Sequence, residues 1–210
     1  GGVWATGEIE NQHRIAYRIP DILHKDKTRY AGKKVLVIGG GHSAINSLLD
    51  LAKLKEEYPS TELHWALHTE KLSQIYGGKE DDALEARGAL GIRIEQLVNS
   101  GQLHIHTPYF IHELEAEADS VTVKGYVRSS FTEIHGVHEI IANTGARPDL
   151  SILREVRVQV DPALECVPEL TELIDPNIHS CGTVRPHGEL ELRQPEPNFY
   201  VVGVKSYGRA

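Results

Sequence analysis

The chain has 210 residues, enough for one large domain or for one domain with attached segments of a second. Its 30 acidic and 22 basic side chains give a net charge of −8 without a clustered Lys/Arg run, so most of its surface would repel a phosphate backbone. We therefore expect no nucleic-acid partner. The sequence shows neither an apolar stretch of about 18 residues nor an export signal, so we expect a cytoplasmic protein with no membrane partner.

The cysteine and methionine content bears on disulfide bonds and on whether the chain is part of a longer protein. Cys166 and Cys181 are too few for a disulfide framework and are expected to be free thiols. The chain contains no methionine and begins Gly1-Gly2, which predicts an excised part of a longer protein.

The first regular elements follow one another closely. Residues 1–30 mix charged and aromatic side chains without a sustained period and are predicted to be a connecting segment. Residues 35–38 form an uninterrupted apolar run, typical of a strand buried on both faces. From His42 onward apolar residues recur every three or four positions, which predicts a helix that ends before Pro59. Residues 63–68 supply a second strand, so the order predicts a βαβ unit.

The rest of the chain predicts one further helix and several strands. Residues 81–99 are rich in helix formers, and residues 103–106 alternate like a strand. Three further strands joined by polar turns are predicted to form an antiparallel meander: residues 111–116, 121–126 and 138–142. Beyond residue 147, where we place a domain boundary, the chain is rich in proline before a last apolar strand at residues 199–202. The predicted fold class is α/β, a Rossmann-like parallel sheet with helices on both faces plus an antiparallel β-meander.

A glycine-rich loop joins the first predicted strand to the first predicted helix. Gly39 would permit the tight turn, Gly41 would let the backbone approach a pyrophosphate, and the small Ala44 would let helix and strand pack closely. Gly40 completes the loop, and the backbone near His42 and Ser43 offers N–H donors at a helix N-terminus. The alternative is a glycine-rich turn without a ligand. Because strand, loop, helix and second strand occur in order, the sequence favours a dinucleotide site for NADP(H) or NAD(H).

The residues after the second strand bear on the choice between the two dinucleotides. An acidic side chain at this place accepts hydrogen bonds from the ribose, whereas a basic one pairs with a 2′-phosphate. His68 stands at the end of the strand and Lys71 could reach a phosphate, yet Glu70 could bind a ribose. We favour NADP, with NAD and an ordinary solvated surface as the alternatives.

Two short segments echo one another and bracket this unit: Ala5-Thr6-Gly7 and Asn143-Thr144-Gly145. The arrangement resembles the two-dinucleotide-binding-domain flavoproteins, which include flavin monooxygenases and pyridine nucleotide-disulfide reductases. In these proteins such segments mark chain crossings between the FAD and NAD(P) domains. The resemblance implies that residues 31–147 are an NAD(P)-binding Rossmann domain. Residues 1–30 would then come from an FAD domain and residues 148–210 would return to it, as partial FAD-domain segments.

Further segments are similar to a bacterial group of FAD/NAD(P)-binding oxidoreductases. They are the loop from Gly39 to Ala44, the run from His179 to Val184, Pro186-His187-Gly188 and the run from Gly203 to Ala210. The resemblance implies cofactor contacts at Thr6, Gly7, Thr144, Gly145, Gly203 and Lys205. The N-terminal FAD motif is missing, and Val204 and Lys205 stand where the superfamily has an Asp after Gly203. The chain by itself is therefore expected to bind flavin poorly or not at all.

In the full-length enzyme the resemblance implies a monooxygenase-like or reductase-like, FAD-dependent NAD(P)H oxidoreductase. Hydride would pass from the nicotinamide to the flavin N5, and the electrons would pass on to oxygen or a small-molecule acceptor. No side chain is an obvious acid or base for this step, so the catalytic residues stay unknown. The alternatives are a non-catalytic NAD(P)-binding sensor or scaffold without flavin, and a Rossmann dehydrogenase that acts alone. A monomer and a homodimer both stay open.

Several polar groups have both a functional and a structural interpretation. A zinc set could be assembled from His179, Cys181, His187 and Cys166. Its spacing is not a standard one, so we predict no metal site and favour a turn-rich segment with a buried thiol. A redox-active thiol is the further alternative, although no Cys-x-x-Cys pair occurs.

Two more groups are expected on polar surfaces. His104 and His106 alternate with apolar residues and therefore share the polar face of a strand. The mixed charges of Asp81, Asp82, Glu85 and Arg87 are expected to form a solvated helix surface rather than a substrate site.

Overall fold

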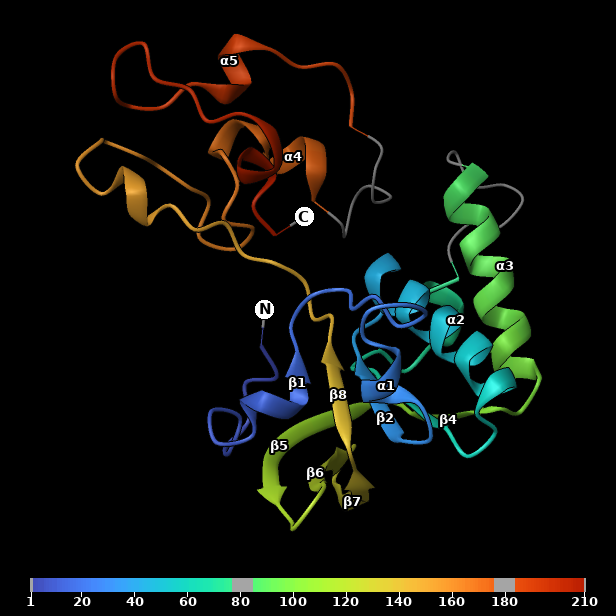
Figure 1. Cartoon of the computed structure of the whole chain (residues 1–210). Coiled ribbons are helices and arrows are strands. Elements are labelled where there is room, and N and C mark those ends of the chain that lie inside the picture. The colour runs from blue at the N-terminus through green and yellow to red at the C-terminus, as the bar shows by residue number, and fades with distance from the viewer. Residues whose placement is uncertain (1, 77–84, 176–183, 210) are drawn as a thin grey trace. The chain divides into compact units, whose positions relative to one another are not determined.

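The structure is a computed structural model that describes residues 2–76, 85–175 and 184–209. The chain divides into two compact units, Gly1–Thr144 and Gly145–Ala210 (Figure 1). Residues 1–30 lie within the first unit, where they contain η1 (Gln12–Arg14), β1 (Ile15–Ala16) and α1 (Lys27–Tyr30). The assignment of the flanking segments to an FAD domain stays a prediction.

The first unit is built on a five-stranded sheet in the order β1-β8-β2-β3-β4, and each pair of neighbouring strands is parallel. Its further strands are β2 (Lys34–Ile38), β3 (Glu62–Ala66), β4 (Leu103–His106) and β8 (Glu139–Ala142). Helix α2 (His42–Glu57) connects β2 to β3, so the predicted βαβ unit is confirmed.

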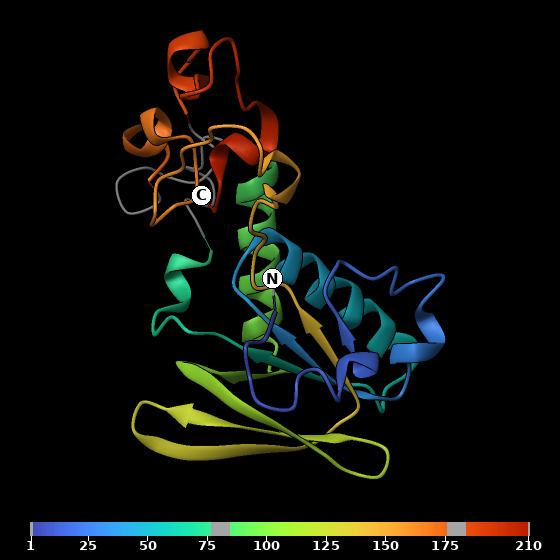
Figure 2. The same ribbon diagram turned by 90° about the vertical axis from the view of Figure 1, so that its left-hand side faces the viewer.

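One face of this sheet packs against helices. Ala44, Ile45 and Leu48 of α2 belong to the same apolar cluster as Val37 and Trp65 of the sheet. Helix α3 (Glu85–Asn99) lies beside α2 and contributes to this cluster (Figures 1 and 2). Because α2 repeats its apolar residues at helical spacing, a single stripe of the helix is buried.

The other face of the sheet packs against a three-stranded antiparallel sheet in the order β5-β6-β7 (Figure 2). These strands are β5 (Tyr109–Ala116), β6 (Val121–Val127) and β7 (Ser130–Val137). Leu36 and Ile140 of the parallel sheet share an apolar cluster with Leu114 and Val123 of the meander.

Two details of the predicted fold are wrong. Residues 138–142 are not the third strand of the meander, because β8 lies between β1 and β2 in the parallel sheet and β7 takes its place. The sheet also does not have helices on both faces, since the meander covers the second face of the described sheet. The apolar run Ile140-Ile141-Ala142 is typical of a parallel strand that is buried on both faces, and this local signal could have assigned it to the parallel sheet.

The second unit consists of turns and short helices: η4 (Ser151–Leu153), η5 (Pro168–Leu170), α4 (Thr171–Ile174), α5 (Glu189–Leu192) and η6 (Gly203–Tyr207). Val167, Leu170 and Val201 form its small core. The strand predicted at residues 199–202 is wrong, because only an isolated bridge joins Tyr200 to Arg193. Among the described helices none has the length and apolar character that a membrane crossing requires.

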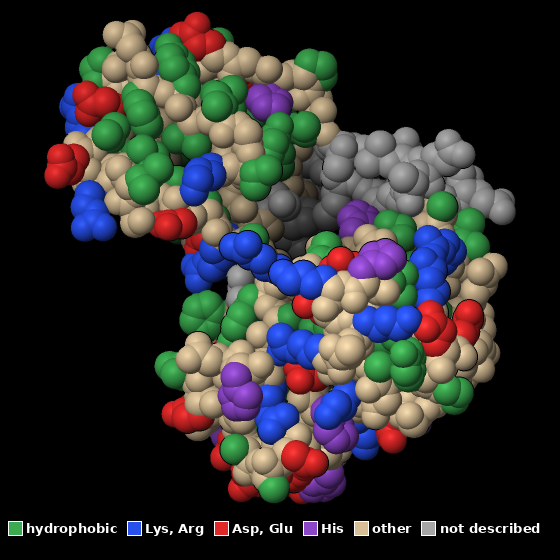
Figure 3. All heavy atoms as spheres, viewed as in Figure 1, with side chains coloured by type: hydrophobic (Ala, Val, Ile, Leu, Met, Phe, Trp, Pro, Cys, Tyr) green, Lys and Arg blue, Asp and Glu red, His purple; other side chains and the backbone are tan. Residues whose placement is uncertain are grey.

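Charged side chains of both signs are interspersed on the face of the molecule drawn in Figure 3. Ion pairs at the surface of each unit include Lys27 with Glu57 and Arg157 with Glu196, and in both pairs at least one side chain is largely exposed. Such pairs contribute little to stability, so the apolar clusters hold each unit together.

Candidate functional site

The glycine loop lies at the carboxyl end of β2, where it turns into α2. Gly39 donates its N–H to the Ala66 carbonyl, with 3.2 Å between nitrogen and oxygen. Its φ is +120°, and a Cβ at this position would lie 2.1 Å from the carbonyl oxygen of Asn143. Only glycine fits, because the backbone that follows β8 passes directly against the turn.

Side chains distant in sequence hold this loop in place. The Trp65 indole donates its N–H to the Gly39 carbonyl at 2.8 Å. The Ser47 hydroxyl lies 3.0 Å from the Ser43 carbonyl and 3.2 Å from Oδ1 of Asn143. Trp65, Ser47 and Asn143 were not predicted as supports of the loop, because no local motif connects them to it.

The N-terminus of α2 is open toward solvent. Gly41 is the N-cap with a φ of −82°, no side chain caps the helix, and its first turn carries no acidic residue. A Cβ on Gly41 would meet nothing within 4 Å, whereas one on Gly40 would lie 3.3 Å from Ile75. Ala44 is fully buried, as close packing of helix and strand requires. Ala44 and Ile45 donate their N–H groups to the Gly41 carbonyl, so the N–H groups of His42 and Ser43 are the donors available to a ligand. Together with the positive end of the helix dipole, they make this a place where an anionic group can bind.

The segment after β3 carries the residues predicted to distinguish NADP from NAD. The exposed His68 ring stacks on Phe110 with 5.1 Å between ring centroids, so it contacts the meander. Lys71 is exposed and its backbone N–H donates to the Thr69 hydroxyl. Glu70 pairs with Arg128 of the β6–β7 turn, with 3.6 Å between carboxylate oxygen and Nε. No local sequence signal connects Arg128 with this segment, because it lies in the turn of a different sheet.

The two echoing segments lie in different surroundings. Thr6 donates its N–H to the His112 carbonyl and accepts from Leu114, so the first segment is bound to β5. Gly7 has a φ of +81°, and a Cβ there would lie 2.2 Å from the Leu114 carbonyl oxygen. Thr144 donates its hydroxyl to the Gly2 carbonyl at 2.8 Å, directly after the Asn143 that contacts Gly39. The second segment therefore adjoins the glycine loop.

The remaining predicted cofactor contacts belong to the second unit. Gly145 and Gly203 both have positive φ, at +90° and +71°. The Lys205 ammonium group donates to the Asp149 carbonyl within the same unit. These residues stay predictions as cofactor contacts.

Three histidines stack on the β3–β4 edge of the parallel sheet. His64 Nδ1 lies 3.0 Å from His106 Nε2, and its ring stacks on His104 at 4.7 Å. Burial, followed by repulsion from His106 and His104, lowers the pKa of His64 to about 4. His104 is exposed as predicted, but His106 is half-buried and His64 was not foreseen as their partner.

The other polar groups provide no further site in the described residues. Cys166 is buried beside the Thr171 hydroxyl, and burial raises the pKa of its thiol, which disfavours the reactive thiolate. His187 stacks edge-on against Tyr207. Within residues 2–76, 85–175 and 184–209, no three His, Cys, Asp or Glu residues could hold a metal. Asp81, Asp82, His179 and Cys181 lie outside the described residues, as do the side chains of Glu85 and Arg87.

A family model described as pyridine nucleotide-disulphide oxidoreductase matches residues 3–182. The chain belongs to this family. Membership confirms the resemblance to two-dinucleotide-binding flavoproteins that the echoing segments and the glycine loop indicated. The parallel sheet with its separate antiparallel sheet also confirms the α/β class.

Several proteins are similar to the chain along much of its length. A ferredoxin–NADP reductase 2 from Shouchella clausii is 25% identical over 198 residues, which are 91% of this chain and 53% of that protein. The solved bacillithiol disulfide reductase of Bacillus cereus is 19% identical with a TM-score of 0.65, covering 98% of this chain and 50% of that one. The thioredoxin reductase of T. acidophilum is 17% identical with a TM-score of 0.54, covering 77% of this chain and 46% of that one. The chain thus spans about half the length of the relatives it matches, and the two solved structures show a shared fold.

Proposed function

We propose that this chain binds NADP(H), with NAD(H) as the alternative, and belongs to an FAD-dependent oxidoreductase. The observation that carries the proposal is the open N-terminus of α2 at Gly41, directly after the buried strand β2. Unpaired N–H groups there can donate to a pyrophosphate, and the missing side chain of Gly41 leaves room for it. The membership of the family supports this assignment.

The residues of the chain have separate tasks in this proposal. The backbone of Gly40, Gly41 and His42 receives the pyrophosphate, while Asn143 and Trp65 keep the loop in the conformation that exposes it. The segment from His68 to Lys71 follows the carboxyl end of β3, where a bound adenosine ribose would lie. When bound, the nicotinamide supplies a hydride for a flavin, and the protein orients the two groups.

The flavin and the electron acceptor belong to the proposal for the whole protein. The names of the relatives include a ferredoxin–NADP reductase, a thioredoxin reductase and a bacillithiol disulfide reductase, which support a reductase-like activity over a monooxygenase-like one. We propose that electrons leave toward a small molecule, oxygen or a redox partner of this kind. A cytoplasmic location and a homodimer also remain predictions.

Substitution of Gly41 tests the nucleotide site without disturbing the fold. Gly41→Asp and Gly41→Asn add side chains of nearly equal size, and both residues are favourable N-caps. We expect Gly41→Asp to raise the Kd for NADPH by at least about tenfold and by more than Gly41→Asn, because a carboxylate repels the pyrophosphate. Isothermal titration calorimetry measures the Kd, and equal melting temperatures show that both variants fold. Unchanged NADPH binding in Gly41→Asp contradicts the assignment.

Anaerobic titration of the full-length protein tests the hydride step. We expect NADPH to bleach the absorbance of the bound flavin, and NADH to do so at higher concentration. If neither nucleotide reduces the flavin, the proposed oxidoreductase is wrong and the non-catalytic NAD(P)-binding module takes its place.

A further inference from the structure

We propose that Arg128 binds the 2′-phosphate of NADPH and thereby selects NADPH over NADH, with Glu70 as its partner when no nucleotide is bound. This inference rests on the proposed function. Arg128 is far from the glycine loop in sequence, and the resemblance to known flavoproteins assigns it no role.

The structure brings the β6–β7 turn to the segment that follows β3. Leu67 donates its N–H to the His106 carbonyl at 3.0 Å and accepts from the Tyr109 N–H at 2.7 Å. The Thr107 hydroxyl donates to the Thr69 carbonyl, and the His68 ring stacks on Phe110. The segment that would receive the ribose is therefore attached to the start of β5.

The register of the meander then places Arg128. Val127, the last residue of β6, pairs with Tyr109, the first residue of β5. Arg128 follows Val127 directly, so it leaves the meander at the end that contacts the segment after β3. Its guanidinium group reaches Glu70 there, with 3.6 Å between Nε and the carboxylate oxygen.

A phosphate can replace the Glu70 carboxylate as the partner of Arg128. The side chains of Arg128 and Glu70 are 75% and 61% exposed, so water screens the pair and it contributes little to stability. A 2′-phosphate carries more negative charge than a carboxylate and offers three acceptor oxygens to a guanidinium fork. In NADH the same ribose position carries only a hydroxyl, which gains little from an arginine. Arg128 therefore distinguishes the two dinucleotides.

The backbone at Arg128 provides a second observation. Its φ is +56°, in the left-handed region, within the two-residue turn between β6 and β7. Turns of this kind favour glycine, asparagine or aspartate, because a β-carbon is disfavoured there. An arginine at such a position indicates that its side chain has a task which offsets the unfavourable conformation.

The decisive variant is Arg128→Gly in the full chain, because glycine suits the left-handed backbone and keeps the turn. We expect the Kd for NADPH to rise by about tenfold or more while the Kd for NADH changes by less than about twofold. Adenosine 2′,5′-bisphosphate and AMP, titrated in the same way, should show the same contrast. Arg128→Lys should keep part of the preference, since it retains the charge but loses the fork. Glu70→Gln should tighten NADPH, because it removes the competing carboxylate.

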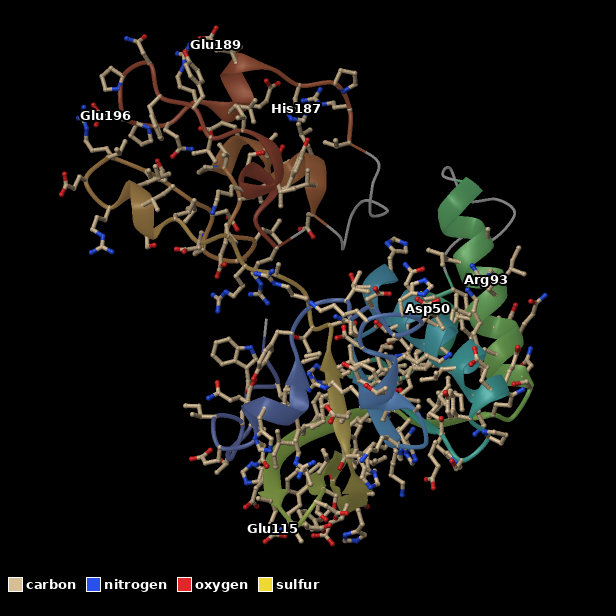
Figure 4. The ribbon with its side chains drawn as sticks, in the orientation of Figure 1. Asp50, Arg93, Glu115, His187, Glu189 and Glu196 are labelled. Carbon is tan, nitrogen blue, oxygen red and sulfur yellow. The ribbon has the colours of Figure 1, made fainter. Side chains whose placement is uncertain are left out.

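Arg93→Ala is the matched control, since it removes one positive charge from the exposed surface of α3 (Figure 4). We expect it to leave both dissociation constants within about twofold of the unsubstituted protein. If the unsubstituted protein binds NADPH but Arg128→Gly keeps its preference over NADH, this inference is overturned and the proposed function stands. If Arg128→Gly weakens the binding of NADPH and NADH equally, the inference is also overturned, because Arg128 would then only maintain the structure of the turn. If the unsubstituted protein binds neither nucleotide, both proposals fail.

Discussion

His64 is a residue whose charge is strongly controlled by its surroundings. Its side chain projects from β3 and is faced by Glu62 on β3, by Lys34 on β2 and by His104 and His106 on β4. The nearest Glu62 carboxylate oxygen is 3.6 Å from Nε2 of the ring, too far for a hydrogen bond, so this buried nitrogen has no hydrogen-bond partner. Desolvation and the two neighbouring imidazoles outweigh the carboxylate, so the folded protein keeps His64 neutral.

The protein should therefore lose stability in acid through His64. The pKa falls from 6.5 in the unfolded chain to about 4 in the folded one, so the unfolded state binds more protons between these values. Stability is complete above the higher pKa and declines as the pH falls toward the lower one. We expect a loss of about 2 kcal/mol in unfolding free energy from neutral pH to about pH 5, measured by urea denaturation.

A substitution separates His64 from other acid effects. His64→Gln should reduce this pH dependence, whatever it does to stability at neutral pH. His24→Gln, which makes the same replacement at an exposed position, is the matched control. The same acid loss in His64→Gln as in the unsubstituted protein would contradict the assignment.

At the scale of elements, Gly91 shows how packing overrides helix propensity. It lies inside α3, where glycine destabilises a helix by about 1 kcal/mol relative to alanine. A Cβ at this position would lie 1.9 Å from the Tyr76 carbonyl oxygen. From the sequence alone this glycine is only unfavourable for a helix. The structure shows that the Tyr76 backbone occupies the space that a side chain at position 91 would need.

Gly91→Ala should accordingly destabilise the protein although alanine is the better helix former. We expect a net loss of about 1–3 kcal/mol, because the helix must move away from the Tyr76 backbone. Thermal or urea unfolding measures it. Gln96→Ala, on the exposed side of the same helix, should not destabilise. A gain in stability from Gly91→Ala would show that α3 does not approach Tyr76 closely.

The elements also show which sequence signals were sufficient to predict a strand or helix and its place in the fold. The β2–α2–β3 unit was predicted because its strand and helix periods are local and undisturbed. β7 was not predicted, because buried and exposed residues do not alternate regularly along it. Among its apolar residues only Ile134 and Val137 are buried. β8 was assigned to the wrong sheet, because the periodicity of a strand does not reveal which strands it pairs with.

At the scale of the whole molecule, the apolar clusters follow the division into two units. The two large clusters draw their residues from the first unit alone, and the small cluster around Leu170 draws its residues from the second. The first unit therefore buries two large clusters of its own, which is the property of a part that folds by itself.

Residues 1–144 expressed alone should accordingly fold and bind NADPH. We expect a single cooperative unfolding transition, followed by circular dichroism, and an NADPH Kd within about threefold of the full chain. The Gly41→Asp variant of the same fragment is the control for specific binding. A fragment without a cooperative transition would show that the second unit is needed for the fold.

The sequence by itself determined the βαβ unit, the glycine loop and the kind of ligand they suit, because each depends on residues close together in the chain. The tertiary structure decided what surrounds the loop. Ser47 and Asn143 meet although they are 96 positions apart, and Arg128 reaches Glu70 from a different sheet. The physical reason is that the position of β8 and the register of the meander follow from hydrogen bonding and burial between distant strands. Local periodicity does not contain these long-range pairings.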